Sequence, residues 1–143
     1  MRYIVATDGS KSSLKAAQFL VRQSCPGPED EIFVIYVFPL PSDPECYEGV
    51  VSLPTEASDD RVAKVAGPIL AKTLEILDKV EGRVDEVVLL GNPAKEIVEF
   101  AMNLGVDLIV AGTRGRTPDN EIYLGSVSSA LTHRALCSVL IVR

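Results

Sequence analysis

The sequence predicts an α/β domain with an open parallel sheet and helices on both of its faces. Short apolar runs alternate with amphipathic helical patterns along the 143 residues, giving five expected strands. That alternation is typical of parallel strands joined by right-handed crossover helices. The nearly continuous apolar run at residues 32–38 favours the same sheet, because parallel strands are covered on both faces. The length fits a single domain, residues 1–143.

The first part of the chain contains two expected strands, residues 2–7 and 31–38, with a helix at residues 11–24 between them. Asp8 and Ser10 are both candidate N-caps of that helix, because each side chain can accept a hydrogen bond from a free helix amide. Two prolines in residues 26–28 end the helix.

A loop rich in proline, residues 39–55, leaves the second strand. Loops of this length are either excursions without a function or binding loops, so both interpretations of it, excursion or lid, stay open. The following helix, residues 62–80, is expected to bend or to divide at Gly67 and Pro68. Its buried face repeats with helical spacing and comprises Val62, Val65, Ala66, Ile69, Leu70, Thr73, Ile76, Leu77 and Val80.

The second part of the chain repeats the pattern with strands at residues 83–90, 107–111 and 138–142. Asn92 and Pro93 are expected at the N-cap and first position of a helix that Gly105 ends. The buried face of this helix is expected to comprise Ile97, Phe100, Ala101 and Leu104. A shorter helix, at about residues 126–134, precedes the last strand.

Composition excludes several classes of function. The net charge of −6 and the pI near 4.8 argue against a general nucleic-acid surface, which would be basic. No apolar stretch approaches the ~18 residues of a membrane-spanning helix, and no secretory signal precedes the first strand. Cys25, Cys46 and Cys137 are an odd number without metal-ligand spacing. We therefore expect a cytoplasmic protein whose partners include neither nucleic acid nor membrane.

A glycine motif joins the fourth strand to the last helix: Gly112-x-x-Gly115-x9-Gly125-Ser126. Glycine permits a tight turn and lets a ligand approach the backbone. The helix that begins at Ser126 would offer free amides and a positive dipole end to a phosphate, and Arg114 adds positive charge. The same residues also fit an ordinary turn between a strand and a helix, and glycine spacing alone does not separate the two interpretations.

These motifs resemble those of the universal stress protein family, whose nucleotide-binding signature has the same glycine spacing. Residues 3–10 resemble the first strand and acidic turn of the family. Residues 91–97 resemble its Gly-x-Pro-x-x-x-Ile segment, and residues 106–110 and 137–142 resemble its last two strands. The resemblance spans the chain and implies an adenine nucleotide alpha hydrolase-like fold with strand order 3-2-1-4-5. In that order the first and fourth strands are neighbours, at the point where α/β sheets bind ligands.

The resemblance and the topology together imply an adenine-nucleotide site. Phosphates are expected to be held by the backbone amides around Gly115, Gly125, Ser126 and Val127, with the hydroxyls of Ser126 and Ser128 as further donors. Asp8 is expected to bind ribose hydroxyls, an adenine edge or, indirectly, Mg²⁺, and it can equally act as a helix cap. The full set of expected site residues is Ala6, Thr7, Asp8, Val37, Ala111, Gly112, Arg114, Gly115, Gly125, Ser126, Val127 and Ser128.

The implied function is that of a stress-response or regulatory protein that binds ATP or AMP, with Mg²⁺ as an optional companion, and that forms a homodimer through Ser138–Val142. The alternative is a dimeric interaction module of the same fold that binds no nucleotide. Asp119 and Glu121 between the glycines would repel a γ-phosphate unless Mg²⁺ bridges them. His133 is expected at the surface and no motif places a base beside Ser126, so we expect at most slow ATP hydrolysis.

Overall fold

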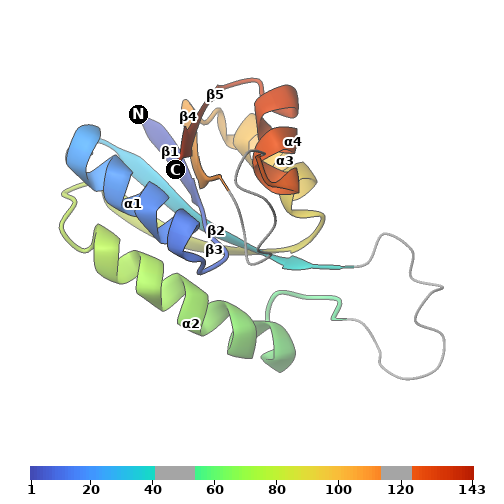
Figure 1. Ribbon diagram of the computed structural model, residues 1–143. Helices are drawn as coiled ribbons and strands as arrows, with labels where there is room; N and C mark the ends of the chain where they lie inside the picture. The colour runs from blue at the N-terminus through green and yellow to red at the C-terminus, as the bar shows by residue number, and fades with distance from the viewer. Residues whose placement is uncertain (41–53, 114–123) are drawn as a thin grey trace, which may run out of the picture.

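In the computed structural model, which describes residues 1–40, 54–113 and 124–143, five strands form one sheet in the order β3-β2-β1-β4-β5. All neighbouring strands are parallel (Figure 1). The predicted fold class and the strand order implied by the resemblance are both confirmed. The elements are β1 (Arg2–Ala6), α1 (Lys11–Gln23), β2 (Glu31–Pro39), α2 (Asp60–Leu77), β3 (Arg83–Gly91), α3 (Pro93–Leu104), β4 (Leu108–Gly112), α4 (Ser126–Arg134) and β5 (Ser138–Val142).

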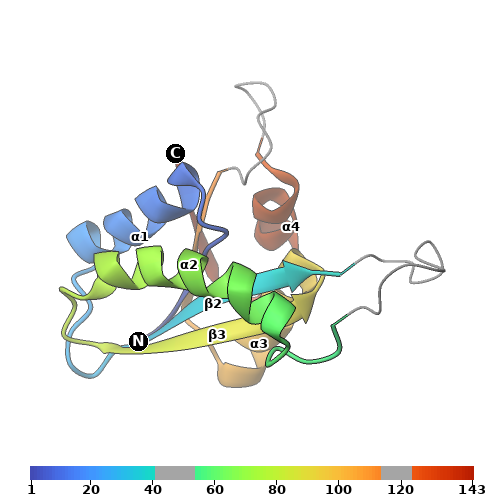
Figure 2. The same ribbon diagram turned by 90° about the horizontal axis from the view of Figure 1, so that it is seen from below.

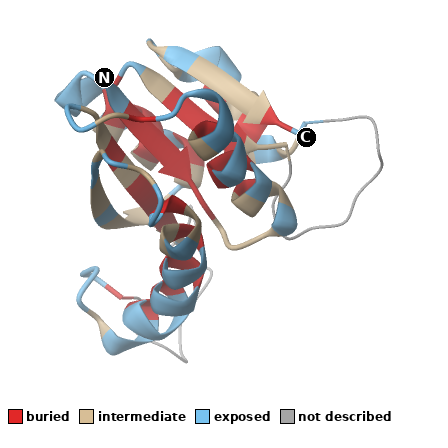
Figure 3. Ribbon diagram, turned by 90° about the vertical axis from the view of Figure 1, so that its left-hand side faces the viewer, coloured by how far each residue is buried: buried red, intermediate tan, exposed pale blue. Residues whose placement is uncertain are grey.

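The sheet is covered by α1 and α2 on one face and by α3 and α4 on the other (Figures 1 and 2). Successive side chains of a strand point to opposite faces. Tyr3 and Val5 of β1 accordingly pack with α1 and α2, whereas Ile4 and Ala6 pack with α3 and α4. The central strand is therefore buried on both faces, as its apolar sequence predicts (Figure 3).

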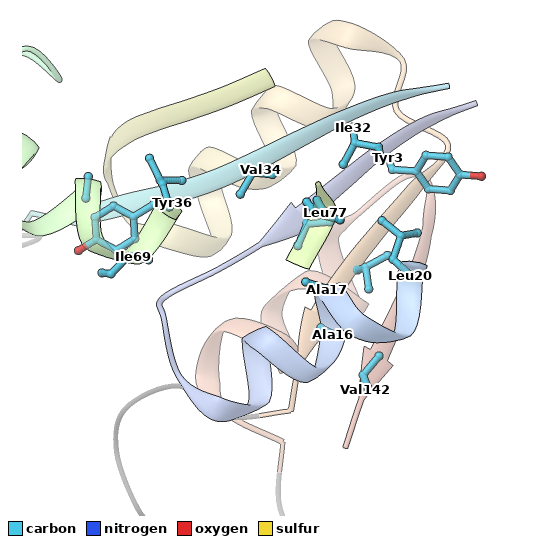
Figure 4. Close-up of a cluster of buried hydrophobic side chains, with 14 residues drawn as sticks. Tyr3, Ala16, Ala17, Leu20, Ile32, Val34, Tyr36, Ile69, Leu77 and Val142 are labelled. Atoms are coloured by element: carbon cyan, nitrogen blue, oxygen red, sulfur yellow. The ribbon is translucent and has the colours of Figure 1, made fainter. Parts of the chain in front are cut away.

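The core on the α1 and α2 face is made of small and medium-sized side chains. Ala16, Ala17 and Leu20 of α1 are fully buried against the sheet, and Leu77 of α2 lies in the same cluster (Figure 4). Alanine at two successive positions lets the α1 backbone approach the sheet closely. This approach places the first turn of α1 beside the ends of β1 and β4.

Helix ends follow the predicted capping residues. Ser10 caps α1, with its Oγ accepting a hydrogen bond from the amide of Ser13 at 3.2 Å. Asn92 caps α3 through the amide of Lys95 at 3.1 Å, and Gly105 ends that helix with a φ of 61°. Of the two candidate caps of α1, Ser10 therefore takes the capping position, and the Asp8 carboxylate accepts from the Ser10 amide instead, at 3.0 Å.

Of the two alternatives for the second helix, division is wrong, because α2 continues through Pro68 as one helix of 18 residues. A bend at Gly67 and Pro68 stays a prediction. Pro68 lies on the exposed side of α2, where the carbonyl that it leaves unpaired can bond to water. The prediction of burial is also wrong for two residues. Val65 is 36% exposed and Leu104, at the end of α3, is 38% exposed.

The loop predicted at residues 39–55 begins one residue later, since β2 includes Pro39. Residues 41–53 lie outside the described part of the chain, so the lid interpretation and Cys46 are not addressed by the structure. Within residues 1–40, 54–113 and 124–143, the helices are all too short or too polar to cross a membrane.

Candidate functional site

The carboxyl ends of β1 and β4 lie side by side at the centre of the sheet. From β1 the chain continues into α1 on one face, and from β4 it continues towards α4 on the other face. This is the switch point at which open α/β sheets bind ligands. The structure therefore brings the acidic turn after β1 and the start of the glycine motif after β4 to the same edge of the sheet, the one formed by the carboxyl ends of the strands.

The turn after β1 is held by short-range hydrogen bonds. Gly9 has a φ of 75°, which a residue with a side chain rarely adopts. Its amide donates to Thr7 Oγ1 at 3.3 Å, and the Ser10 amide donates to Asp8 Oδ1 at 3.0 Å. The half-buried Asp8 carboxylate is thereby fixed at the edge of the sheet.

Beneath this turn lies a buried cluster of hydroxyl groups, Thr7, Ser13 and Thr73, which come from β1, α1 and α2. Thr7 Oγ1 lies 2.9 Å from Thr73 Oγ1 and 3.3 Å from Ser13 Oγ. Ser13 Oγ also donates to the carbonyl of Ser10 at 3.0 Å. Buried hydroxyls are stable only when hydrogen-bonded, and in the described part of the chain every buried side-chain polar atom has a partner.

On the β4 side, Gly112 lets the strand end approach the first turn of α1. A Cβ atom on Gly112 would lie 2.4 Å from Ser12 Oγ and 2.5 Å from the Ser12 carbonyl carbon. The next residue, Thr113, has its hydroxyl 3.3 Å from the Ser12 hydroxyl. The first glycine of the motif is therefore required by packing between β4 and α1.

The start of α4 is anchored to the end of β4 through the carbonyl of Thr113. This oxygen accepts from the Gly125 amide at 2.7 Å and from Ser128 Oγ at 2.8 Å. Gly125 is the N-cap and has no side chain to bond to the helix amides. The amides of the first turn of an α-helix lack acceptors within the helix, so α4 presents donors and a positive dipole end at this edge.

The start of α4 is held by its own backbone and by Ser128. Gly125 has φ −61° and ψ 161°, angles that any residue adopts, so the backbone conformation does not require glycine there. The buried Ser128 hydroxyl donates to the carbonyls of Thr113 and Gly125. It therefore holds the turn together, whereas the exposed Ser126 side chain faces outward from the core.

The other titratable groups singled out in the sequence lie away from this edge. His133 is exposed near the carboxyl end of α4, with Nδ1 2.7 Å from the carbonyl oxygen of Ser129. Burial raises the pKa of the half-buried Cys137 thiol, which makes it less reactive. Among the described residues, no three His, Cys, Asp or Glu side chains gather closely enough to hold a metal ion.

Comparison with known proteins decides the family. The model of the universal stress protein family matches residues 1–143. The chain is 32% identical to universal stress protein MJ0531 of Methanocaldococcus jannaschii over 99% of this chain and 81% of that protein. It is also 32% identical to universal stress protein YxiE of Bacillus subtilis, over 99% and 98%. The chain belongs to the universal stress protein family.

Solved structures of universal stress proteins share the fold. The structure of MJ0577 from the same archaeon has a TM-score of 0.76 at 24% identity, covering 99% of this chain and 94% of that one. A universal stress protein in complex with cAMP has a TM-score of 0.60 at 28% identity, covering 100% and 97%. An Arabidopsis thaliana family member with AMP bound has a TM-score of 0.64 at 15% identity, covering 99% and 90%.

Most residues expected to form the universal stress protein site lie along this edge of the sheet. Asp8 belongs to the turn, and Gly125, Ser126, Val127 and Ser128 form the start of α4. The side chains of Ala6, Val37 and Ala111 are buried in the core on the α3 and α4 face, so these residues can offer a ligand mainly backbone atoms. Arg114 and Gly115 lie outside the described residues.

Sequence reasoning missed four residues that shape the site: Ser12, Ser13, Thr73 and Thr113. Three serines in residues 10–13 were a visible signal, because serine is common at helix starts and rare in apolar faces. Thr73 was the one polar residue in the predicted buried face of its helix. A lone hydroxyl in such a face implies a buried hydrogen-bond partner, although the sequence does not identify it.

Proposed function

We propose that this universal stress protein binds an adenine nucleotide, ATP or AMP, at the carboxyl ends of β1 and β4 and serves as a stress-response or regulatory binding protein. The observation that carries the proposal is the pair of hydrogen bonds to the Thr113 carbonyl. They hold the start of α4 at the end of β4, on the same edge as the Asp8 turn. A helix start favours phosphate, and a carboxylate favours ribose hydroxyls.

Each end of the nucleotide has candidate partners in this proposal. The amides of Ser126, Val127 and Ser128 bind phosphate oxygens, and the Asp8 carboxylate accepts from the ribose hydroxyls. The backbone at Val37, near the end of β2, contacts adenine, as the family resemblance implies. Arg114 and Gly115 complete the phosphate site, and Mg²⁺ accompanies ATP. The AMP and cAMP bound by family members support an adenosine phosphate as the ligand.

We assign no catalytic residue, and the proposed activity is binding. His133 is on α4 in its last turn, whereas the phosphates would bind at the first turn of the same helix. Binding alone is enough for a regulatory role, because a nucleotide that prefers one conformation of the protein increases the population of that conformation.

Titration calorimetry with ATP, AMP and adenosine tests the proposal, using the parent and Gly125→Val. The backbone angles of Gly125 suit any residue, so the variant is expected to fold, as checked by circular dichroism. Its side chain would displace phosphate from the helix amides. Each hydrogen bond to a charged group is worth about 1.5–3 kcal/mol, so losing two weakens ATP binding by about 100-fold or more. Adenosine, which has no phosphate, is expected to lose little.

Gly27→Val is the matched control, because a Cβ at Gly27 has no heavy atom within 4 Å and its φ is not positive. It is expected to bind ATP as the parent does. A folded parent that binds none of the three ligands would contradict the proposal and favour the interaction module. A Gly125→Val protein that binds ATP as tightly as the parent would show that the helix start is not the phosphate site.

We also propose that the protein is a homodimer that pairs through β5. This strand is at the sheet edge beside β4, and its Val139, Leu140 and Ile141 side chains are only half-buried. Leu136, just before the strand, is 82% exposed. Apolar sheet edges associate unless they are covered, and a two-fold axis lets two copies cover each other.

A further inference from the structure

We propose that Thr73 of α2 is a positioning residue for the nucleotide site, and that its hydroxyl fixes the Asp8 turn through Thr7. This inference rests on the proposed function, and it assigns to α2 a part in ligand binding that the glycine motif does not include. Thr73 does not touch the ligand in this proposal. It acts through two hydrogen bonds that lead to the residue beside Asp8.

Packing alone does not explain threonine at position 73. The residue is 0% exposed and lies between Ile69 and Leu77 on the buried face of α2. Valine has nearly the same shape and would avoid the cost of burying a hydroxyl. The hydroxyl instead has two partners, Thr7 Oγ1 at 2.9 Å and the Ile69 carbonyl at 3.3 Å.

Thr7 connects Thr73 to the turn through a hydrogen bond with the Gly9 amide. Its Oγ1 accepts from the Gly9 amide at 3.3 Å and lies 3.3 Å from Ser13 Oγ. Each hydroxyl has one hydrogen. Ser13 donates to the Ser10 carbonyl and Thr7 donates to Ser13. The Thr73 hydroxyl therefore supplies the hydrogen of its 2.9 Å contact with Thr7 Oγ1, which also accepts from the Gly9 amide. The rotamer of Thr7 is thus set on one side by α2 and sets the Gly9 amide on the other.

A second contact from α2 reaches the same turn. A Cβ on Gly9 would lie 3.1 Å from Ile69 Cγ1, so Ile69 packs directly against the Gly9 backbone. Ile69 and Thr73 are one helical turn apart on α2. The helix therefore supports the turn at two points, one apolar and one polar, and Asp8 lies between the two residues that receive this support.

The test compares Thr73→Val, Thr73→Ser and the control Thr132→Val. Thr132 is exposed on α4, and its hydroxyl donates to the Ser129 carbonyl at 2.7 Å, so the control also removes one hydroxyl from a helix. Loss of the Thr73 hydroxyl is expected to weaken AMP binding by roughly three- to tenfold. Thr73→Ser, which keeps the hydroxyl, and Thr132→Val are expected to bind AMP as the parent does.

A double-mutant cycle with Asp8→Ala separates positioning from general stability. If Thr73 acts through Asp8, Thr73→Val is expected to change AMP affinity by less than about twofold once Asp8 is removed. An equal loss in both backgrounds would overturn the inference, because a merely structural residue weakens binding whether or not Asp8 is present. Parent-like AMP binding by Thr73→Val would overturn it too.

Hydrogen exchange of the Gly9 amide, measured by nuclear magnetic resonance without nucleotide, tests the mechanism itself. Faster exchange at Gly9 in Thr73→Val but not in Thr132→Val is expected, and unchanged exchange would overturn the inference. The two proposals fail in different ways. A parent that binds no AMP overturns both, whereas a parent that binds AMP and is insensitive to Thr73→Val overturns this inference alone.

Discussion

At Gly112, a Cβ atom would lie 2.4 Å from Ser12 Oγ and 2.5 Å from the Ser12 carbonyl carbon. The second distance involves backbone, which cannot rotate away as a flexible side chain can. Gly112→Ala is therefore expected to lower the free energy of unfolding by about 1–3 kcal/mol, the usual cost of overpacking. Urea unfolding measures this, with Gly27→Ala as the control in open space. A Gly112→Ala protein as stable as its control would contradict the close contact between β4 and α1.

Asp59 gives a residue-scale prediction about pH. Its carboxylate caps α2 and accepts from the Arg61 guanidinium at 2.6 Å and from the Arg61 amide at 2.9 Å. Both bonds lower the pKa of Asp59, from 3.8 to about 2, and the bond from the guanidinium has the larger effect. Because the pKa of Asp59 is lower in the folded state than in the unfolded state, ionised Asp59 stabilises the folded state. This stabilisation is complete above pH ~4 and is lost as the pH falls towards 2.

Asp59→Asn keeps an N-cap acceptor but removes the charge. The variant is expected to be less stable than the parent at pH 6, and the difference is expected to shrink by pH 2.5. Urea unfolding at the two pH values measures both. A difference of the same size at pH 2.5 and pH 6 would show that the Asp59 charge does not act in the folded state.

At the scale of the element, α2 tolerates a proline in its interior because Pro68 lies on its exposed side. Pro68→Ala restores an amide that can bond to the Lys64 carbonyl, and interior proline costs a helix ~3 kcal/mol. Replacing proline also makes the unfolded chain more flexible, which lowers the free energy of unfolding by about 0.4–1 kcal/mol. We expect a net gain of about 2–2.6 kcal/mol in urea unfolding. Pro28→Ala, in the exposed turn after α1, is expected to give no gain, and a loss on Pro68→Ala would contradict this account.

At the scale of the whole molecule, the open edge at β5 predicts association. The parent is expected to sediment as a dimer at micromolar concentration. Leu136→Asp is expected to weaken the dimer by about 10-fold or more, because burying a leucine is worth about 1.5–3 kcal/mol. Met102→Asp is the control, since Met102 is 55% exposed on α3, away from this edge. A monomeric parent would rule out pairing through β5.

The sequence by itself determined the elements and several of their ends. Residues 32–38 predicted a strand covered on both faces, and Asn92, Pro93 and Gly105 marked the two ends of α3. These features are local, since periodicity and capping depend on residues within a few positions of one another. Family resemblance, not periodicity, supplied the strand order and with it the edge at which Asp8 and the glycine motif meet.

Tertiary structure alone decided which residues meet across that edge. The pairs Gly112 with Ser12 and Thr7 with Thr73 join positions 100 and 66 residues apart. Their contact depends on how closely α1 and α2 approach the sheet, and no local pattern encodes that distance. The same reason explains Val65, whose spacing predicted burial while the position of α2 on the sheet left it exposed. Interactions between residues close in the sequence determine the helices and strands. The packing of segments that are far apart in the sequence determines which polar groups contact one another.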